Sequence, residues 1–217
     1  EDNTREALFD ALQRREVYAS TGPRITLRLF AGWGFTGEEL DDADFAAQGY
    51  SAGVPMGGQL KGSCEQTGEL SILVKASKDP LGANLDRIQI VKGWMDQGEH
   101  REQVHDVALS DGREVREDGQ VLDVGNTVDS QSATYANTIG AAELGTVWID
   151  REFDPEQQAF YYARVLEIPT PRWTTYDAAA FEIPPPDNVP GRVQQRVYSS
   201  PVWYKPYEAA TGSDCRG

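Results

Sequence analysis

Cysteine is scarce in this sequence. The 217 residues include two cysteines, Cys64 and Cys215, and no CxxC pair or cysteine–histidine group has zinc-site spacing. The sequence therefore predicts no structural zinc site. The two thiols are compatible with one disulfide between the first third and the end of the chain, which needs an oxidising compartment. They are equally compatible with two unrelated cysteines.

Histidine is equally scarce, and its two copies do not form a catalytic pattern. His100 and His105 lie five residues apart in HREQVH, whereas a metal-binding pair on one helix face is spaced i, i+4. On a strand, the observed spacing puts them on opposite faces. No GxSxG elbow accompanies them, so a Ser–His–Asp triad is not supported and we expect surface roles.

Positive charge is in short supply, and the net charge is −15. Such a surface repels phosphate backbones and anionic membranes, so we expect no nucleic-acid partner. Solubility is the simplest role of this charge, with a divalent cation or a cationic partner as the alternative. The acidic stretch GEELDDADF (37–45) lacks the central glycine and the ligand offsets of an EF-hand. We interpret it as a solvated face.

Long hydrophobic runs are absent, so the sequence predicts no membrane-spanning helix. No secretory leader is visible either. Hydrophobic residues still make up 39% of the chain and aromatic residues 10%, which is enough for the core of one large domain.

A helix is predicted over residues 4–15. Asn3 and Glu6 form a capping-box pattern, and apolar residues such as Leu8 and Leu12 recur at helical spacing on one face. One isolated helix cannot bury such a face by itself. We therefore expect this helix to dock on another structure.

Most of the remaining chain alternates apolar and polar residues, as strands do. A Gly-rich surface excursion over 32–68, with a short helix near 41–48, interrupts this pattern. The sequence thus predicts a mainly β fold, an antiparallel β-sandwich of immunoglobulin-like type preceded by one helix. The predicted strands cover residues 25–30, 69–76, 85–93, 103–110, 158–168 and 197–204, with further strands over 121–129 and within 133–149.

The stretch STGP (20–23) is the first candidate for ligand contact. Gly22 and Pro23 favour a turn between two structural units. Thr21 and Arg24 are candidate substrate contacts beside it, since a hydroxyl or a guanidinium can bind an anion. The stretch matches neither a P-loop nor GxGxxG, and a purely structural turn is the favoured interpretation.

RWTTYDA (172–178) is the second candidate. Arg172, Trp173, Tyr176 and Asp177 offer a planar cation, two aromatic faces and a carboxylate after the extended backbone that Pro169 and Pro171 impose. We predict a substrate-contacting loop. The structural alternative is that Trp173 plugs the edge of the sandwich and Arg172 pairs with Asp177.

Several long stretches resemble one bacterial family. NTREALFDALQRREVYASTGPRITL (3–27), TYANTIGAAEL (134–144) and FYYARVLEIPTPRWTTYDA (160–178) are similar to the C-terminal part of the domain-of-unknown-function family DUF3604. The similarity extends from Asn3 to about Tyr204. It implies three parts: residues 1–23 as the last helix and exit turn of a barrel, 24–207 as a β-sandwich, and 208–217 as a tail.

The resemblance also implies a larger parent protein. Family members carry an N-terminal barrel similar to the PHP metal-dependent hydrolases, which binds divalent zinc, manganese or iron. The ligand motifs of that barrel are missing here, so no catalytic or metal-binding residue is expected in this chain.

The resemblance thus implies an accessory sandwich of a phosphoesterase, non-catalytic alone, whose partner is the rest of the parent or a second copy. The alternative is a free-standing module for carbohydrate binding, protein binding or oligomerisation. Exported relatives imply a periplasmic or secreted location, with the cytoplasm left open.

Overall fold

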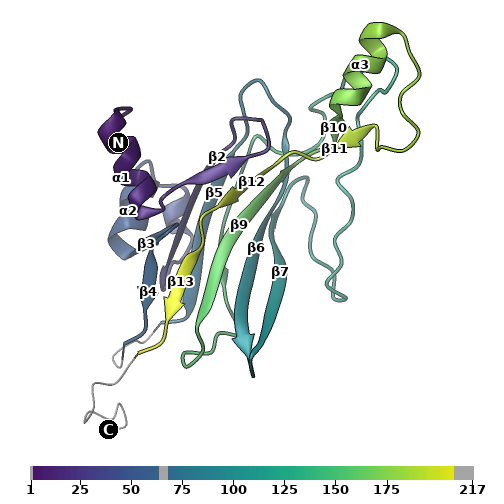
Figure 1. Ribbon diagram of the computed structural model, residues 1–217. Helices are drawn as coiled ribbons and strands as arrows, with labels where there is room; N and C mark the ends of the chain where they lie inside the picture. The colour runs from purple at the N-terminus through teal and green to yellow at the C-terminus, as the bar shows by residue number, and fades with distance from the viewer. Residues whose placement is uncertain (1, 64–67, 208–217) are drawn as a thin grey trace.

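The computed structural model describes residues 2–63 and 68–207. In this part of the chain, two β-sheets pack face to face with helices at their margins (Figure 1). The predicted mainly β, antiparallel sandwich is confirmed. The larger sheet contains seven strands: β1 (Tyr18–Ser20), β4 (Gln59–Lys61), β6 (Leu85–Asp96), β7 (Glu99–Leu109), β9 (Ala159–Glu167), β12 (Arg196–Ser199) and β13 (Val202–Lys205).

Strand β9 organises the large sheet. Its residues alternate strictly, and Ala159, Tyr161, Ala163 and Val165 are all buried between the sheets. One side of β9 pairs with β6, which continues to β7. The other side pairs with β12 along one half and with β13 along the other half. Pro201 separates these two strands, so the single strand predicted over 197–204 is in fact two.

The small sheet has the order β3-β2-β5-β8 and supplies the other wall of the core. Both faces of β5 are buried, because Phe30, Phe45 and Leu73 form a second apolar cluster on the outer side. The helix α2 (Phe45–Ala52) contributes Phe45 and confirms the helix expected in this excursion. The remaining elements of this layer are β2 (Thr26–Trp33), η1 (Glu38–Leu40), β3 (Gly53–Pro55), β5 (Leu70–Ser77) and β8 (Glu143–Ile149).

The N-terminal helix forms as predicted, with a different cap. Helix α1 covers Arg5–Arg14, and the side chain of Thr4, rather than Asn3, accepts the capping hydrogen bond from the amide of Ala7 at 3.2 Å. Arg15 ends the helix in the left-handed conformation, with φ 59°.

Two predictions of secondary structure are wrong. Within the described residues, 121–129 contains no strand and pairs only through an isolated bridge between Asp129 and Thr134. The stretch is held instead by Arg113, which donates to the carbonyl of Leu122 at 2.9 Å and to the buried carboxylate of Asp86 at 2.5 Å. The predicted RWTTYDA loop is largely helix: α3 covers Trp173–Phe181 and follows the short β10 (Thr170–Pro171), which pairs with β11 (Arg192–Val193).

The expected surface role of both histidines is also only half right. His100 is exposed, whereas His105 points inward and its ring lies 4.8 Å from the ring of Trp148, centroid to centroid. Burial lowers the pKa of His105, which favours its neutral form. The spacing correctly predicted that the two side chains lie on opposite faces of the strand. It did not show that the face of His105 is turned toward the core.

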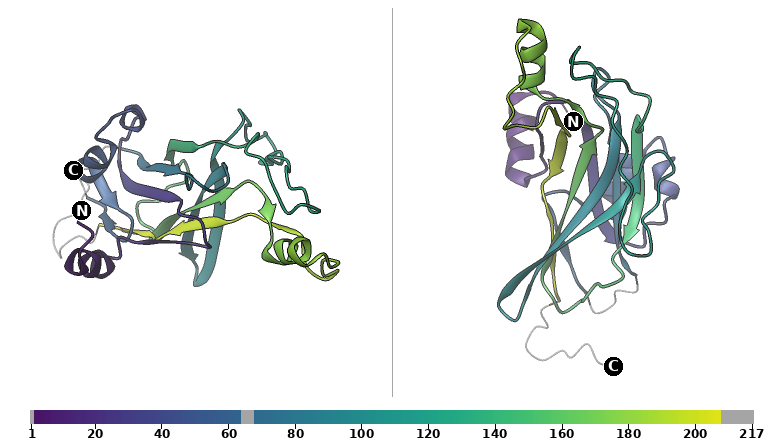
Figure 2. Two further views of the ribbon diagram at one scale, coloured as in Figure 1. Left: turned by 90° about the horizontal axis from the view of Figure 1, so that it is seen from above. Right: turned by 90° about the vertical axis from the view of Figure 1, so that its right-hand side faces the viewer.

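Both α1 and α3 project from the same side of the large sheet (Figure 2). Figure 1 shows them on either flank of one end of the sandwich, the end opposite the β6–β7 hairpin. None of the helices in the described part of the chain is long and apolar enough to cross a membrane.

Candidate functional site

Four segments that are distant in sequence meet at one end of the sandwich, which we call the α3 end. They are residues 21–24, 78–84, 134–141 and 167–178, and they include the candidate residues of both predicted sites. The extended backbone imposed by Pro169 and Pro171 leads into α3, whose N-cap is Arg172 with φ −72° and ψ 157°. Helix α3 thereby points away from the sheet (Figure 1).

Asn84 connects the family-like stretches at this end. Its side-chain amide donates to the carbonyl of Ile139 at 2.9 Å, and its backbone N–H donates to the side-chain oxygen of Asn137 at 2.8 Å. The carbonyl of Asn84 accepts from the N–H of Ile168 at 2.9 Å. One asparagine thus holds TYANTIGA against the start of EIPTPRW, which sequence distance alone did not suggest.

Gly140 allows this close packing. Its φ is +79°, a left-handed conformation that favours glycine. A Cβ atom there would lie 2.7 Å from Cγ2 of Ile168 and 2.9 Å from the carbonyl oxygen of Leu85. Any larger residue would push residues 134–141 away from the end of β9.

Glu167 is the most unusual side chain of the α3 end. It is 2% exposed, and its Oε1 has no hydrogen-bond partner among the described residues. Burial and, to a smaller extent, the negative charge of Asp79 raise the pKa of Glu167 to about 7, although the positive charge of Lys78 opposes the shift. A carboxyl group with this pKa can gain or lose a proton near neutrality, which is typical of a functional group.

Tyr135 and Asp79 lie around Glu167. Burial, followed by the charges of Glu167, Tyr176 and Asp79, raises the pKa of Tyr135. Asp79 accepts from the backbone N–H of Arg24 at 2.8 Å and of Leu81 at 3.0 Å, and these hydrogen bonds lower its pKa. The α3 end therefore combines one ionised carboxylate with one carboxyl group poised between its two forms.

The two aromatic candidates on α3 are exposed. Trp173 is 66% exposed and Tyr176 46% exposed, so neither plugs the sandwich. Within the described residues Arg172 and Asp177 form no ion pair, and the buried Nε of Arg172 has no hydrogen-bond partner. Both structural alternatives considered from the sequence are therefore wrong, and the aromatic faces of α3 are open.

The Thr21 turn belongs to the framework of the site. The Thr21 hydroxyl donates to Oε1 of Gln195 at 2.5 Å and accepts from the N–H of Arg196 at 3.0 Å. The carbonyl of Gln195 in turn accepts from the N–H of Glu167 at 2.9 Å. Thr21 thus supports the backbone that carries Glu167, while Arg24 reaches Asp79 through its backbone.

The residues present do not fit a metal centre. In residues 2–63 and 68–207, no group of three or more His, Cys, Asp or Glu side chains lies close enough together to hold a metal ion. The predicted disulfide partners Cys64 and Cys215 lie outside the described residues.

Sequence reasoning missed Glu167 and Tyr135. Glu167 ends strand β9 on the buried face that it shares with Tyr161 and Val165, although a carboxylate at a strand end normally faces water. The clue available in the sequence was that both residues lie inside stretches that resemble one family, TYANTIGAAEL and FYYARVLEIPTPRWTTYDA. However, a resemblance to the same family does not show that the two stretches lie close together in the folded chain.

Comparison with known proteins identifies a family for this chain but no similar curated protein or solved structure. The model of the family described as "Protein of unknown function (DUF3604)" matches residues 1–206. No curated protein and no solved structure matches the chain. Because the match covers nearly the whole sequence, the chain belongs to the DUF3604 family.

Proposed function

We propose that this chain is an accessory β-sandwich, non-catalytic alone, that packs against a PHP-like metal-dependent hydrolase barrel and leans its α3 end over the substrate. Metal-bound water would be the nucleophile in such a barrel. The residues described here would bind and orient the substrate, a phosphoester.

The exposed apolar face of α1 carries this proposal. Leu8 is 55% exposed, Phe9 57% and Leu12 63%, and α1 buries none of its residues. Covering such side chains contributes about 1.5–3 kcal/mol each. An amphipathic helix that turns its apolar face away from its own domain needs a partner, and a barrel of which α1 is the last helix would supply it.

The position of α3 supports the second half of the proposal. The two helices project from the same side of the large sheet (Figure 2), so a body docked on α1 would face α3. Trp173 and Tyr176 would then stack on the substrate, and the Arg172 guanidinium would bind its anionic group.

The first experiment measures the intact mass and the metal content of the protein purified from its native source. We expect a mass well above the 24.0 kDa of this chain, together with bound zinc, manganese or iron. A metal-free native protein of the mass of this chain would contradict the proposal. It would leave the free-standing binding or oligomerisation module as the function.

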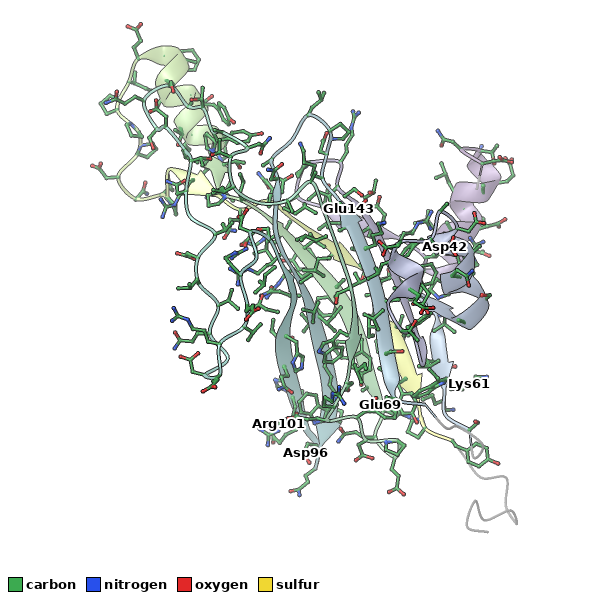
Figure 3. All side chains as sticks on the ribbon, turned by 180° about the vertical axis from the view of Figure 1, so that it is seen from behind. Asp42, Lys61, Glu69, Asp96, Arg101 and Glu143 are labelled. Atoms are coloured by element: carbon green, nitrogen blue, oxygen red, sulfur yellow. The ribbon has the colours of Figure 1, made fainter. Side chains whose placement is uncertain are left out.

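The second experiment tests the α3 end in the full-length protein with a chromogenic phosphoester. Arg172→Ala should raise KM about tenfold or more, because a charge-assisted contact to the substrate is lost. Arg151→Ala is the matched control: its side chain is 76% exposed and pairs with Glu69, whose end of the sandwich lies opposite α3 (Figure 3). Equal KM values for the two variants would remove Arg172 from the site.

A further inference from the structure

A row of outward-facing side chains crosses the large sheet at the end opposite α3. Glu102 on β7 pairs with Gly93 on β6, which pairs with Phe160 on β9. Phe160 pairs with Trp203 on β13, and Trp203 pairs with Gln59 on β4. Because paired residues share a face and strands lie about 4.8 Å apart, the row extends over about 19 Å. Its centre is aromatic and its two ends are polar.

Gly93 shapes the floor of this row. A Cβ atom at Gly93 would overlap the ring of Phe160, so glycine lets that ring lie across the sheet. Trp203 is 44% exposed, and its ring centroid lies 5.4 Å from that of Phe160 at an angle of 51°. These rings line a groove of about 440 Å³, which lies in the size range of small-molecule sites. We call it the aromatic groove.

Hydrogen-bonding side chains surround the two rings. The groove is also lined by Gln158, His100 and Lys205, in addition to Glu102 and Gln59. Amide, carboxylate, imidazole and ammonium groups together offer donors and acceptors in several directions. A ligand that presents both apolar faces and hydroxyl groups matches this mixture better than a purely apolar one.

The central strands beneath the two rings have no open edge. Strands β6, β9 and β13 each pair with a neighbour on both sides, so a peptide cannot add to them as a further strand. Recognition at the two rings therefore rests on side chains.

The charge of the groove also indicates its ligand. The chain carries −15 overall, yet the groove is lined by charges of both signs: Glu102 is acidic, and Arg101 and Lys205 are basic. Arg101 also forms an ion pair with Asp96 at 3.7 Å, and both lie at the tip of the β6–β7 hairpin (Figure 3). A groove with a few charges of mixed sign attracts neither polyanions nor polycations strongly, so it complements an uncharged ligand.

We propose that the aromatic groove binds an uncharged oligosaccharide. The C–H faces of its sugar rings pack on Trp203 and Phe160, and its hydroxyl groups exchange hydrogen bonds with Glu102, Gln59 and Gln158. The site lies at the opposite end of the sandwich from α3 and serves attachment to a glycan rather than catalysis.

The test is isothermal titration calorimetry of the full chain with neutral hexasaccharides of glucose, mannose, xylose, galactose and N-acetylglucosamine. At least one should bind with one-to-one stoichiometry. Trp203→Ala should weaken that binding about tenfold or more, because the stacking surface is lost. Tyr18→Ala is the matched control: Tyr18 is 43% exposed, close to the value for Trp203, but lies on the distant strand β1, so affinity should not change.

Gly93→Ser is a second variant, because it displaces the Phe160 ring and leaves Trp203 in place. It should also weaken binding, and circular dichroism checks that both variants fold. Three results would overturn the proposal: no binding of any of the five sugars, equal affinity of Trp203→Ala and the unmodified chain, or tighter binding of a galacturonate hexamer than of the galactose hexamer. Self-association of the chain that Trp203→Ala abolishes would assign the groove to a second copy instead.

Discussion

The two ends of the sandwich each bury a carboxylate, but only one of these carboxylates has an ion-pair and hydrogen-bond partner among the described residues. Near the β6–β7 hairpin end, Asp150 is 2% exposed at its side chain and meets Lys92 Nζ at 2.6 Å. The Tyr161 hydroxyl donates to the same carboxylate at 2.7 Å, and this hydrogen bond and burial together raise the pKa of Tyr161. At the α3 end, Glu167 is equally buried but its Oε1 has no partner in the described part of the chain.

The difference between Asp150 and Glu167 distinguishes a carboxylate that stabilises the fold from one that does not. A paired and hydrogen-bonded charge keeps its ionised form and fixes one arrangement of the core. An unpaired carboxyl group in the same kind of environment shifts its pKa instead and lowers the stability of the fold at neutral pH. At the α3 end, the buried carboxyl group of Glu167 lowers stability and lies beside exposed aromatic residues and an unpartnered guanidinium nitrogen. Groups with shifted pKa values that lower stability in this way are typical of binding sites.

Removing Lys92 should have the largest effect. Lys92→Met leaves Asp150 buried and unpaired, so the free energy of unfolding should fall by about 3–5 kcal/mol in urea titrations. Lys75→Met is the control, because Lys75 pairs with the half-exposed Glu143 and its loss should cost about 1 kcal/mol or less. The double variant Lys92→Met/Asp150→Leu should recover much of the loss. Equal losses for the two single lysine variants would show that the buried pair has no special role.

Glu167→Gln should change how stability depends on pH. Because the folded pKa of about 7 exceeds the ordinary value of 4.5, the native state holds one more proton than the unfolded state between these pH values. The folded protein therefore loses stability as pH rises through this window, by up to about 3 kcal/mol for this residue.

Thermal unfolding from pH 5 to pH 8 measures this effect. Glu167→Gln should be more stable than the unmodified chain at pH 8 and should lose that advantage toward pH 5. His105, whose lowered pKa gives the opposite slope near pH 6, is present in both proteins and cancels in the difference. A difference that does not vary with pH would show that Glu167 is ionised throughout.

Gly140→Ala should have an intermediate effect on the α3 end. It combines a left-handed φ with a Cβ that would touch Ile168, so the loss of stability should be about 1–3 kcal/mol. Gly98→Ala is the matched control: its φ is +85°, with open space around the Cβ. The larger loss at Gly140 should come with a smaller pH dependence, because water would reach Glu167. Equal losses would mean that the backbone conformation alone requires glycine at both sites.

Tyr161→Phe should lower stability about as much as Gly140→Ala. It removes one hydrogen bond to a charged group and leaves the Lys92–Asp150 pair intact, so urea titrations should show a loss of about 1.5–3 kcal/mol. The loss should stay constant between pH 5 and pH 8, in contrast to the behaviour of Glu167→Gln. A loss that varied with pH as Glu167→Gln does would remove the contrast between the two ends of the sandwich.

Local pattern in the amino-acid sequence was enough for the fold class, the helix 4–15 and most of the strands. The alternation in β9 reflects which face meets the core, and that period is a local property. Alternation failed over 121–129, because a strand also needs a neighbour, and here the side chain of Arg113 anchors the segment instead. The loop predicted for RWTTYDA is wrong because Arg172 is the N-cap residue of helix α3, and the position of this helix depends on tertiary packing.

Only the tertiary structure decided which residues meet. Asn84 joins 134–141 to 167–178, and burial at the end of β9 raises the pKa of Glu167. Strand register places Glu102, Phe160 and Trp203 in one row, although they come from three distant parts of the chain. The periodicity of a sequence predicts which way each side chain faces. Burial, charge balance and long-range register depend on neighbouring segments, and no local pattern specifies those neighbours.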